Sequence, residues 1–124
     1  MIDLDKIDRL MQEAEYIVVD TETNGLLPFC GDRVIGVALY FPHADEAVYW
    51  PVRHGQKDDV DMGYKLNFPI SSLDFLKKYF EDDSKVFIYH NAKFDINFMH
   101  QEGFPVPVNM RDTLIASHLM NENY

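Results

Sequence analysis

The sequence has little cysteine, few basic side chains and no long apolar run. Its single cysteine, Cys30, cannot form an intrachain disulfide, which favours a reducing compartment. No apolar stretch approaches the roughly 20 residues of a membrane-spanning helix, and the N-terminus lacks a basic, apolar signal sequence. Eleven lysines and arginines stand against 21 aspartates and glutamates, and this net charge of −10 excludes wrapping of duplex DNA by a general basic surface. We therefore expect a cytoplasmic protein with no membrane partner and only local contacts to any nucleic acid.

The sequence does contain enough apolar material for one hydrophobic core. Its 124 residues are 47% hydrophobic and 14% aromatic, so we expect a single domain spanning residues 1–124. An antiparallel unit of three strands followed by strands that alternate with helices predicts a mixed α/β sheet flanked by helices. Apolar spacing predicts helices at 4–14, 73–80 (N-capped by Ser71 or Ser72), 91–101 and 112–119, and strands at 16–19, 34–41, 47–52, 86–89 and 106–109.

Two acidic residues stand at the end of the most apolar predicted strand, in the tripeptide Asp20-Thr21-Glu22. Residues two apart on a strand point to the same side, so the two carboxylates lie next to each other. No lysine or arginine flanks them in the sequence, and a divalent cation would neutralise the pair. The alternative is that Asp20 caps the turn while Glu22 is merely solvated.

A second polar cluster, His90-Asn91-Ala92-Lys93-Phe94-Asp95, follows the predicted strand 86–89 and opens a helix. Asp95 lies one helical turn after Asn91, so both can face the same point above the edge of the sheet. If the two strands are neighbours, Asp95 joins Asp20 and Glu22 in a three-carboxylate site suited to Mg²⁺ or Mn²⁺. The alternative is a simple cap at Asn91 and a solvated Asp95.

Together these motifs resemble a known family. DTETNGL at 20–26 and HNAKFD at 90–95 are similar to the first two motifs of the DEDD (DnaQ-like) 3′-to-5′ exonucleases. The resemblance is closest to the proofreading exonuclease domain of bacterial and phage family-A DNA polymerases, and it extends from about Tyr16 to Asn123. It implies an RNase H-like fold and hydrolysis of a terminal phosphodiester with two Mg²⁺ or Mn²⁺ ions.

The resemblance also implies a role for individual residues. Asp20, Glu22 and Asp95 would be both the catalytic residues and the ligands of the two ions. Asp112 would cap a helix and act indirectly on the site. Leu26 would be an apolar wedge between the last bases, although an ordinary core leucine is the alternative. The residues implied in substrate binding are Thr23, Asn24, Gly25, Leu26, Asn91 and Phe94.

One part of the family pattern is missing from this sequence. The fourth acid belongs to a third motif, Tyr-x-x-x-Asp or His-x-x-x-Asp, and no such motif follows Asp112. His118 and Glu122 have the spacing, with glutamate in place of aspartate. We therefore expect a C-terminally truncated, partial domain with weakened activity, which would self-associate through the apolar face that truncation uncovers.

Three functions fit these patterns. The first is a proofreading 3′-to-5′ exodeoxyribonuclease that acts on the 3′ end of single-stranded DNA, with a linked or separate polymerase domain as partner. The second is a catalytically silent domain that binds metal or a DNA end or serves as an interaction module. The third is an RNase D-like RNA exonuclease. Lys93, Arg53 and Arg111 are candidates for phosphate contacts.

Overall fold

A five-stranded sheet with the strand order β3-β2-β1-β4-β5 forms the centre of the protein. The computed structural model describes residues 3–54 and 67–114. In this described part α1 precedes the first strand, and the other helices, including the short 3₁₀ helices η1 and η3, lie between strands along the chain. The elements along the chain are α1 (Leu4–Glu13), β1 (Tyr16–Thr23), η1 (Pro28–Cys30), β2 (Val34–Phe41), β3 (Glu46–Pro51), η3 (Ile70–Leu73), α2 (Asp74–Phe80), β4 (Val86–Tyr89), α3 (Ala92–Gln101) and β5 (Met110–Asp112).

The mixed sheet is the one expected from the sequence. β1 is the central strand, and it pairs antiparallel with β2 and parallel with β4. β2 and β3 form an antiparallel hairpin joined by residues 42–45, and β5 adds a parallel edge strand beside β4. The fold class predicted from the sequence is therefore confirmed for the described residues.

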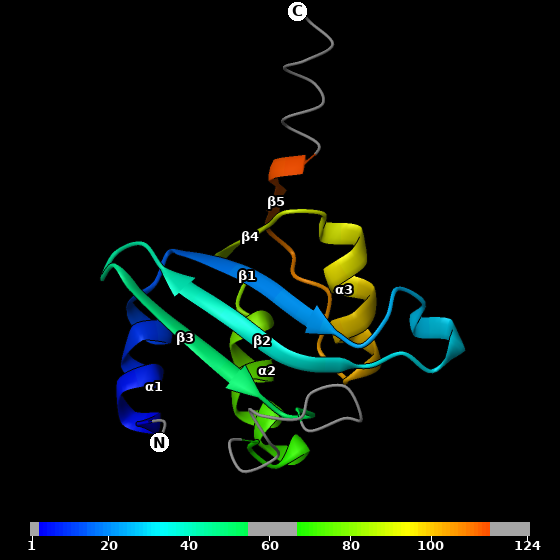
Figure 1. The fold of residues 1–124 in the computed structure, drawn as a ribbon. Helices are drawn as coiled ribbons and strands as arrows, with labels where there is room; N and C mark the ends of the chain where they lie inside the picture. The colour runs from blue at the N-terminus through cyan, green and yellow to red at the C-terminus, as the bar shows by residue number, and fades with distance from the viewer. Residues whose placement is uncertain (1–2, 55–66, 115–124) are drawn as a thin grey trace, which may run out of the picture.

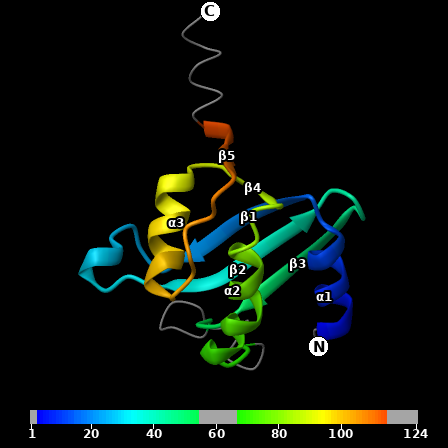
Figure 2. The same cartoon turned by 180° about the vertical axis from the view of Figure 1, so that it is seen from behind.

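The described helices α1, α2 and α3 all lie on one face of the sheet (Figures 1 and 2). The core fills the space between this helix layer and the sheet, where Phe80 stacks on Phe87 at 4.4 Å between ring centroids. Ile17 and Val19 of β1 point into this core, while the N-terminal residue of the strand, Tyr16, is 47% exposed. The continuous apolar run at 16–19 is typical of a strand buried on both faces, but that expectation is wrong for the described residues, because these helices cover a single face.

Several predicted boundaries shift for local reasons. β1 continues to Thr23, because the C-terminal residues of the strand pair with β2 as far as the pair of Thr23 with Val34. No side chain caps the helix after Ser71 and Ser72, since the 3₁₀ turn η3 precedes α2 there.

The last strand also differs from its predicted position. It begins at Met110 rather than Val106, because Pro105 and Pro107 lack the N–H groups that a ladder needs. Most of the predicted helix 112–119 and the pair His118 and Glu122 lie outside the described residues. None of the described helices is long and apolar enough to cross a membrane.

Candidate active site

The Asp20-Thr21-Glu22 segment divides its side chains between the two faces of β1. Asp20 and Glu22 are exposed, whereas Thr21 is buried and points with Val19 toward the helix layer. The alternation follows from the two-residue period of a strand. The structure thus places the two acids on the same side, as the sequence predicts.

Asp95 reaches β1 because the neighbouring strand ends early. β4 pairs with β1 only at residues 16–18, and β1 then runs on beyond the last pair, Val18 with Ile88. α3 begins three residues after β4 ends and lies beside this extension of β1 (Figure 1). There the hydroxyl of Thr21 donates a hydrogen bond of 2.5 Å to Oδ1 of Asp95.

Asp95 is a buried carboxylate that is only half satisfied. The residue is 3% exposed, and within the described part of the chain its Oδ2 has no hydrogen-bond partner. The pKa of Asp95 is raised to about 6, chiefly by burial; the hydrogen bonds of Thr21 oppose the rise, and the negative charges of Asp20 and Asp112 add to it. The alternative of a solvated helix residue is therefore excluded.

The three predicted carboxylates do not form one cluster in the described part of the chain. Among residues 3–54 and 67–114, no three His, Cys, Asp or Glu side chains stand close enough together to hold a metal ion. The geometric reason is that Asp95 bonds to Thr21, whose side chain points away from the face that carries Asp20 and Glu22. Asp95 and Asp20 are nevertheless coupled through their charges.

The loop after β1 is closed by its own polar groups. The Thr23 hydroxyl donates to the carbonyl oxygen of Gly25, and Oδ1 of Asn24 accepts from the backbone N–H of Arg33. Asp32 accepts from the N–H of Leu27, and a Cβ at Gly25 would collide with the Asp32 carboxylate. Residues predicted to touch substrate therefore also shape the loop that presents Leu26.

This loop is fastened to the C-terminal end of α3. Gln101 donates to the carbonyl oxygen of Pro28 at 2.6 Å, and Arg33 pairs with Glu102 at 2.9 Å. Arg53 pairs with the same carboxylate at 2.6 Å and also donates to the carbonyl of Val34. Arg53 is therefore part of a structural ion pair rather than a free contact for phosphate.

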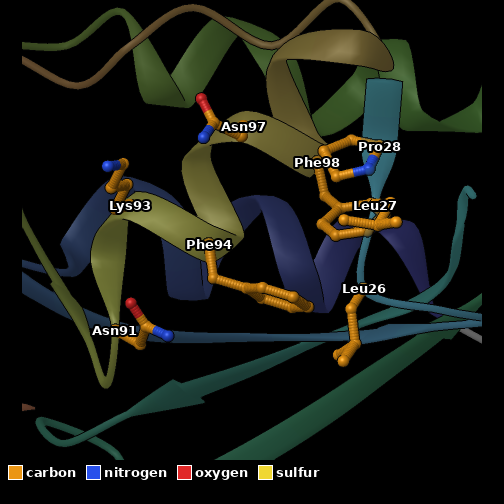
Figure 3. A pocket seen from close by; sticks show the side chains of 8 residues that line it. All are labelled: Leu26, Leu27, Pro28, Asn91, Lys93, Phe94, Asn97 and Phe98. Carbon is orange, nitrogen blue, oxygen red and sulfur yellow. The ribbon is translucent and has the colours of Figure 1, made fainter. Parts of the chain in front are cut away.

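A cavity of about 260 Å³ lies between the loop and α3. Figure 3 shows apolar side chains along one side, including Leu26, Leu27 and Phe94, with the polar ends of Asn91, Lys93 and Asn97 along the other. Leu26 is 75% exposed, so the core-leucine alternative is wrong. The apolar wall and polar rim suit an aromatic base attached to a charged backbone.

Other residues of the site were not assigned from the sequence. Leu27, Pro28 and Asn97 line the cavity, and their positions depend on how the loop folds against α3. The inward position of Thr21 could be predicted from the sequence, because a strand that exposes Asp20 and Glu22 must direct the residue between them to the other face. Asp112, predicted to cap a following helix, is the last residue of β5 and accepts from Leu114 N–H, but it also bonds to the start of α3.

Known proteins match this chain over nearly its whole length. A family described as 3′–5′ exonuclease matches residues 2–123. DNA polymerase I of Borreliella burgdorferi is 31% identical over 123 residues, which cover 98% of this chain and 12% of that protein. The chain thus spans about an eighth of this curated relative.

Solved structures share the fold. Brucella melitensis NrnC is 26% identical with a TM-score of 0.66, and the match covers 100% of this chain and 50% of that one. Other structures of NrnC carry bound Mg²⁺ or bound pGG. Escherichia coli RNase D, an exoribonuclease, has a TM-score of 0.60 at 14% identity, and the match covers 89% of this chain and 24% of that one.

Proposed function

Because this chain belongs to the 3′–5′ exonuclease family, we propose that it hydrolyses the terminal phosphodiester of single-stranded DNA from the 3′ end. Proofreading is the proposed role, since the relatives found by sequence are DNA polymerases, such as that of Borreliella burgdorferi. A polymerase domain, linked or separate, is the proposed partner. The self-association of this chain and its location in the cytoplasm stay predictions.

The chemistry of the three carboxylate side chains, rather than their present spacing, fits divalent cations. Oδ2 of Asp95 is buried and without a partner in the described residues, next to the strand that carries Asp20 and Glu22. Hard oxygen ligands of this kind suit Mg²⁺ or Mn²⁺, and we propose that these three carboxylates hold two ions. When bound, such ions would activate water and stabilise the leaving 3′ oxygen. The unpartnered oxygen of Asp95 is the single observation that carries this proposal.

The chain's own side chains would bind and orient the terminal nucleotide. Leu26 and Phe94 line the cavity with Leu27, and together they would offer apolar surfaces to the base and shield one side of the base from water. Asn91 and Lys93 line the same cavity, where an amide and an ammonium group can contact phosphate oxygens. The closed loop at 24–33 would keep this surface preformed, so that little ordering is needed on binding.

The proposal is tested by the release of nucleotides. Single-stranded DNA labelled at its 3′ nucleotide should slowly release labelled nucleoside 5′-monophosphate in Mn²⁺. Asp20→Ala should lower the rate by roughly 100-fold or more, because it removes a proposed ligand. Asp82→Ala is the matched control, since Asp82 is exposed and its carboxylate accepts from Ser84 and pairs with Lys85. Equal rates for the wild type and Asp20→Ala would contradict the catalytic proposal.

A second arm of the same assay uses RNA of the same sequence. Structural similarity to RNase D favours including it, although that likeness at 14% identity concerns the fold alone. If nucleotides are released faster from RNA than from DNA, RNA becomes the proposed substrate. Binding of a DNA end without release from either polymer would instead favour the catalytically silent domain.

A further inference from the structure

The helix that carries Asp95 has no N-terminal cap of its own. Asn91 is at the N-cap position of α3, and its side chain makes no capping hydrogen bond. Its backbone is left-handed, with φ 82° and ψ 65°, a conformation that a non-glycine residue keeps only when the surroundings hold it. The free N–H groups at the start of the helix need an acceptor from elsewhere in the chain.

Asp112, at the end of β5, supplies that acceptor from across the sheet edge. Its Oδ1 accepts from the backbone N–H of Asn91 at 3.1 Å, and its Oδ2 accepts from the N–H of Ala92 at 2.8 Å. Oδ1 also accepts from the N–H of Leu114 at 2.9 Å. A carboxylate with several N–H donors at a helix N-terminus forms charge-assisted hydrogen bonds and opposes the positive end of the helix dipole.

A second contact ties the same two segments together. The Thr113 hydroxyl donates to the carbonyl oxygen of Tyr89 at 3.2 Å, and it lies 2.8 Å from Nδ1 of His90. Since the hydroxyl has one proton, Nδ1 of His90 is the donor in the second bond. Asp112 and Thr113 thus fix every residue from the end of β4 to the first residue of α3.

We propose that Asp112 is a positioning residue that holds Asp95 against β1 and thereby sets the affinity of the site for a divalent cation. Asp95 lies one helical turn after Asn91, so a shift of the first turn of α3 moves its carboxylate relative to Thr21. Asp112 itself contacts backbone groups and is not proposed as a ligand. This inference rests on the proposed function of the carboxylate site.

The test measures Mn²⁺ binding to the full chain by electron paramagnetic resonance, without substrate. Asp112→Ala should weaken Mn²⁺ binding by about 10- to 100-fold, the range found when residues that orient metal ligands are removed. Asp112→Glu keeps the charge but moves the carboxylate, and it should also weaken binding. Asp112→Asn keeps one oxygen acceptor and should fall between the wild type and Asp112→Ala. Excess Mn²⁺ should partly restore nuclease activity to Asp112→Ala.

The matched control is Asp3→Ala, because Asp3 caps α1 through the N–H of Lys6 in another part of the fold. It should lower stability and leave Mn²⁺ affinity unchanged. A folded Asp112→Ala variant that binds Mn²⁺ with wild-type affinity would overturn the inference. If the alanine variant does not fold, wild-type Mn²⁺ affinity in Asp112→Asn would overturn it instead. Wild-type affinity in Asp20→Ala would instead contradict the proposed function itself.

Discussion

At the scale of single residues, Asp95 combines burial with an incomplete set of partners. One oxygen accepts from Thr21, and the other has no partner in the described residues. A buried carboxylate without a positive partner destabilises a fold, which is why its pKa rises to about 6. Strongly perturbed pKa values of this kind are typical of binding and catalytic sites. The destabilisation caused by the buried Asp95 carboxylate should therefore be measurable in the free energy of unfolding.

We predict that Asp95→Asn stabilises the metal-free protein near pH 7 while abolishing nuclease activity. Because the folded-state pKa is raised from 3.8 to about 6, the folded state binds more protons than the unfolded state between these values. Wild-type stability therefore falls as pH rises through this window. The variant lacks that loss, so it should gain about 1–3 kcal/mol at pH 7 and almost nothing below pH 4.

Urea unfolding in EDTA at a series of pH values provides the measurement. Asp20→Asn is the comparison, since Asp20 is exposed and loses little solvation on folding. Its gain should be clearly smaller than that of Asp95→Asn. A less stable Asp95→Asn protein at pH 7 would show that the negative charge of Asp95 is compensated in the fold.

At the scale of elements, α3 is held at both ends and carries the site between them. Asp112 bonds to its first turn, while Arg33 and Arg53 bond to Glu102 just after its last residue. The Glu102 side chain is 2% exposed. Burial acts to raise the pKa of Glu102, but the hydrogen bonds and charges of Arg53 and Arg33 outweigh it and lower the pKa below its usual 4.5.

We predict that Glu102→Gln destabilises the protein by roughly 3 kcal/mol at pH 7, because it leaves two guanidinium groups without their carboxylate. One of them, Arg53, is only 13% exposed. Since the folded-state pKa is depressed, the ion pair contributes fully above pH 4.5 and is lost as pH falls through the lowered pKa. The stability gap between wild type and variant should therefore narrow in acid.

The control substitution is Glu46→Gln, which breaks the exposed pair with Lys6. Exposed pairs contribute about 0–1 kcal/mol, so thermal unfolding of this variant should nearly match the wild type. Binding of a single-stranded oligonucleotide offers a second readout. Glu102→Gln should weaken it, because the same carboxylate fastens the 24–33 loop, which forms one wall of the cavity, through Arg33. A gap that stays constant between pH 7 and pH 3 would contradict the depressed pKa.

The elements show what the sequence can and cannot predict here. Period-two and helical spacing predicted the strands at 34–41 and 86–89, the helix at 91–101 and the shared side of Asp20 and Glu22. Spacing along the chain could not predict which face Asp95 approaches, because that depends on β4 ending before β1 does. Nor could it pair Asp112 with α3, since that contact joins residues 20 apart on different elements.

At the scale of the whole molecule, excess negative charge limits how nucleic acid can bind. The net charge is −10, and two of the described arginines, Arg33 and Arg53, are already paired with Glu102. Of the cavity-lining residues, Lys93 is the one with a positive side chain. Affinity for single-stranded DNA must then come largely from base contacts and from cations held by the carboxylates, rather than from a basic groove.

We predict weak binding of a single-stranded oligonucleotide in EDTA, with a shallow dependence on salt. For single strands the slope of log K against log[salt] is about −0.7 for each neutralised phosphate, so one or two contacts give a slope of roughly −1. Lys93→Ala should reduce its magnitude by about 0.7. Lys78→Ala, an exposed change on α2, should leave it unchanged. Fluorescence anisotropy between low and moderate salt measures the slopes, and a steep slope that survives Lys93→Ala would show a basic surface elsewhere on the chain.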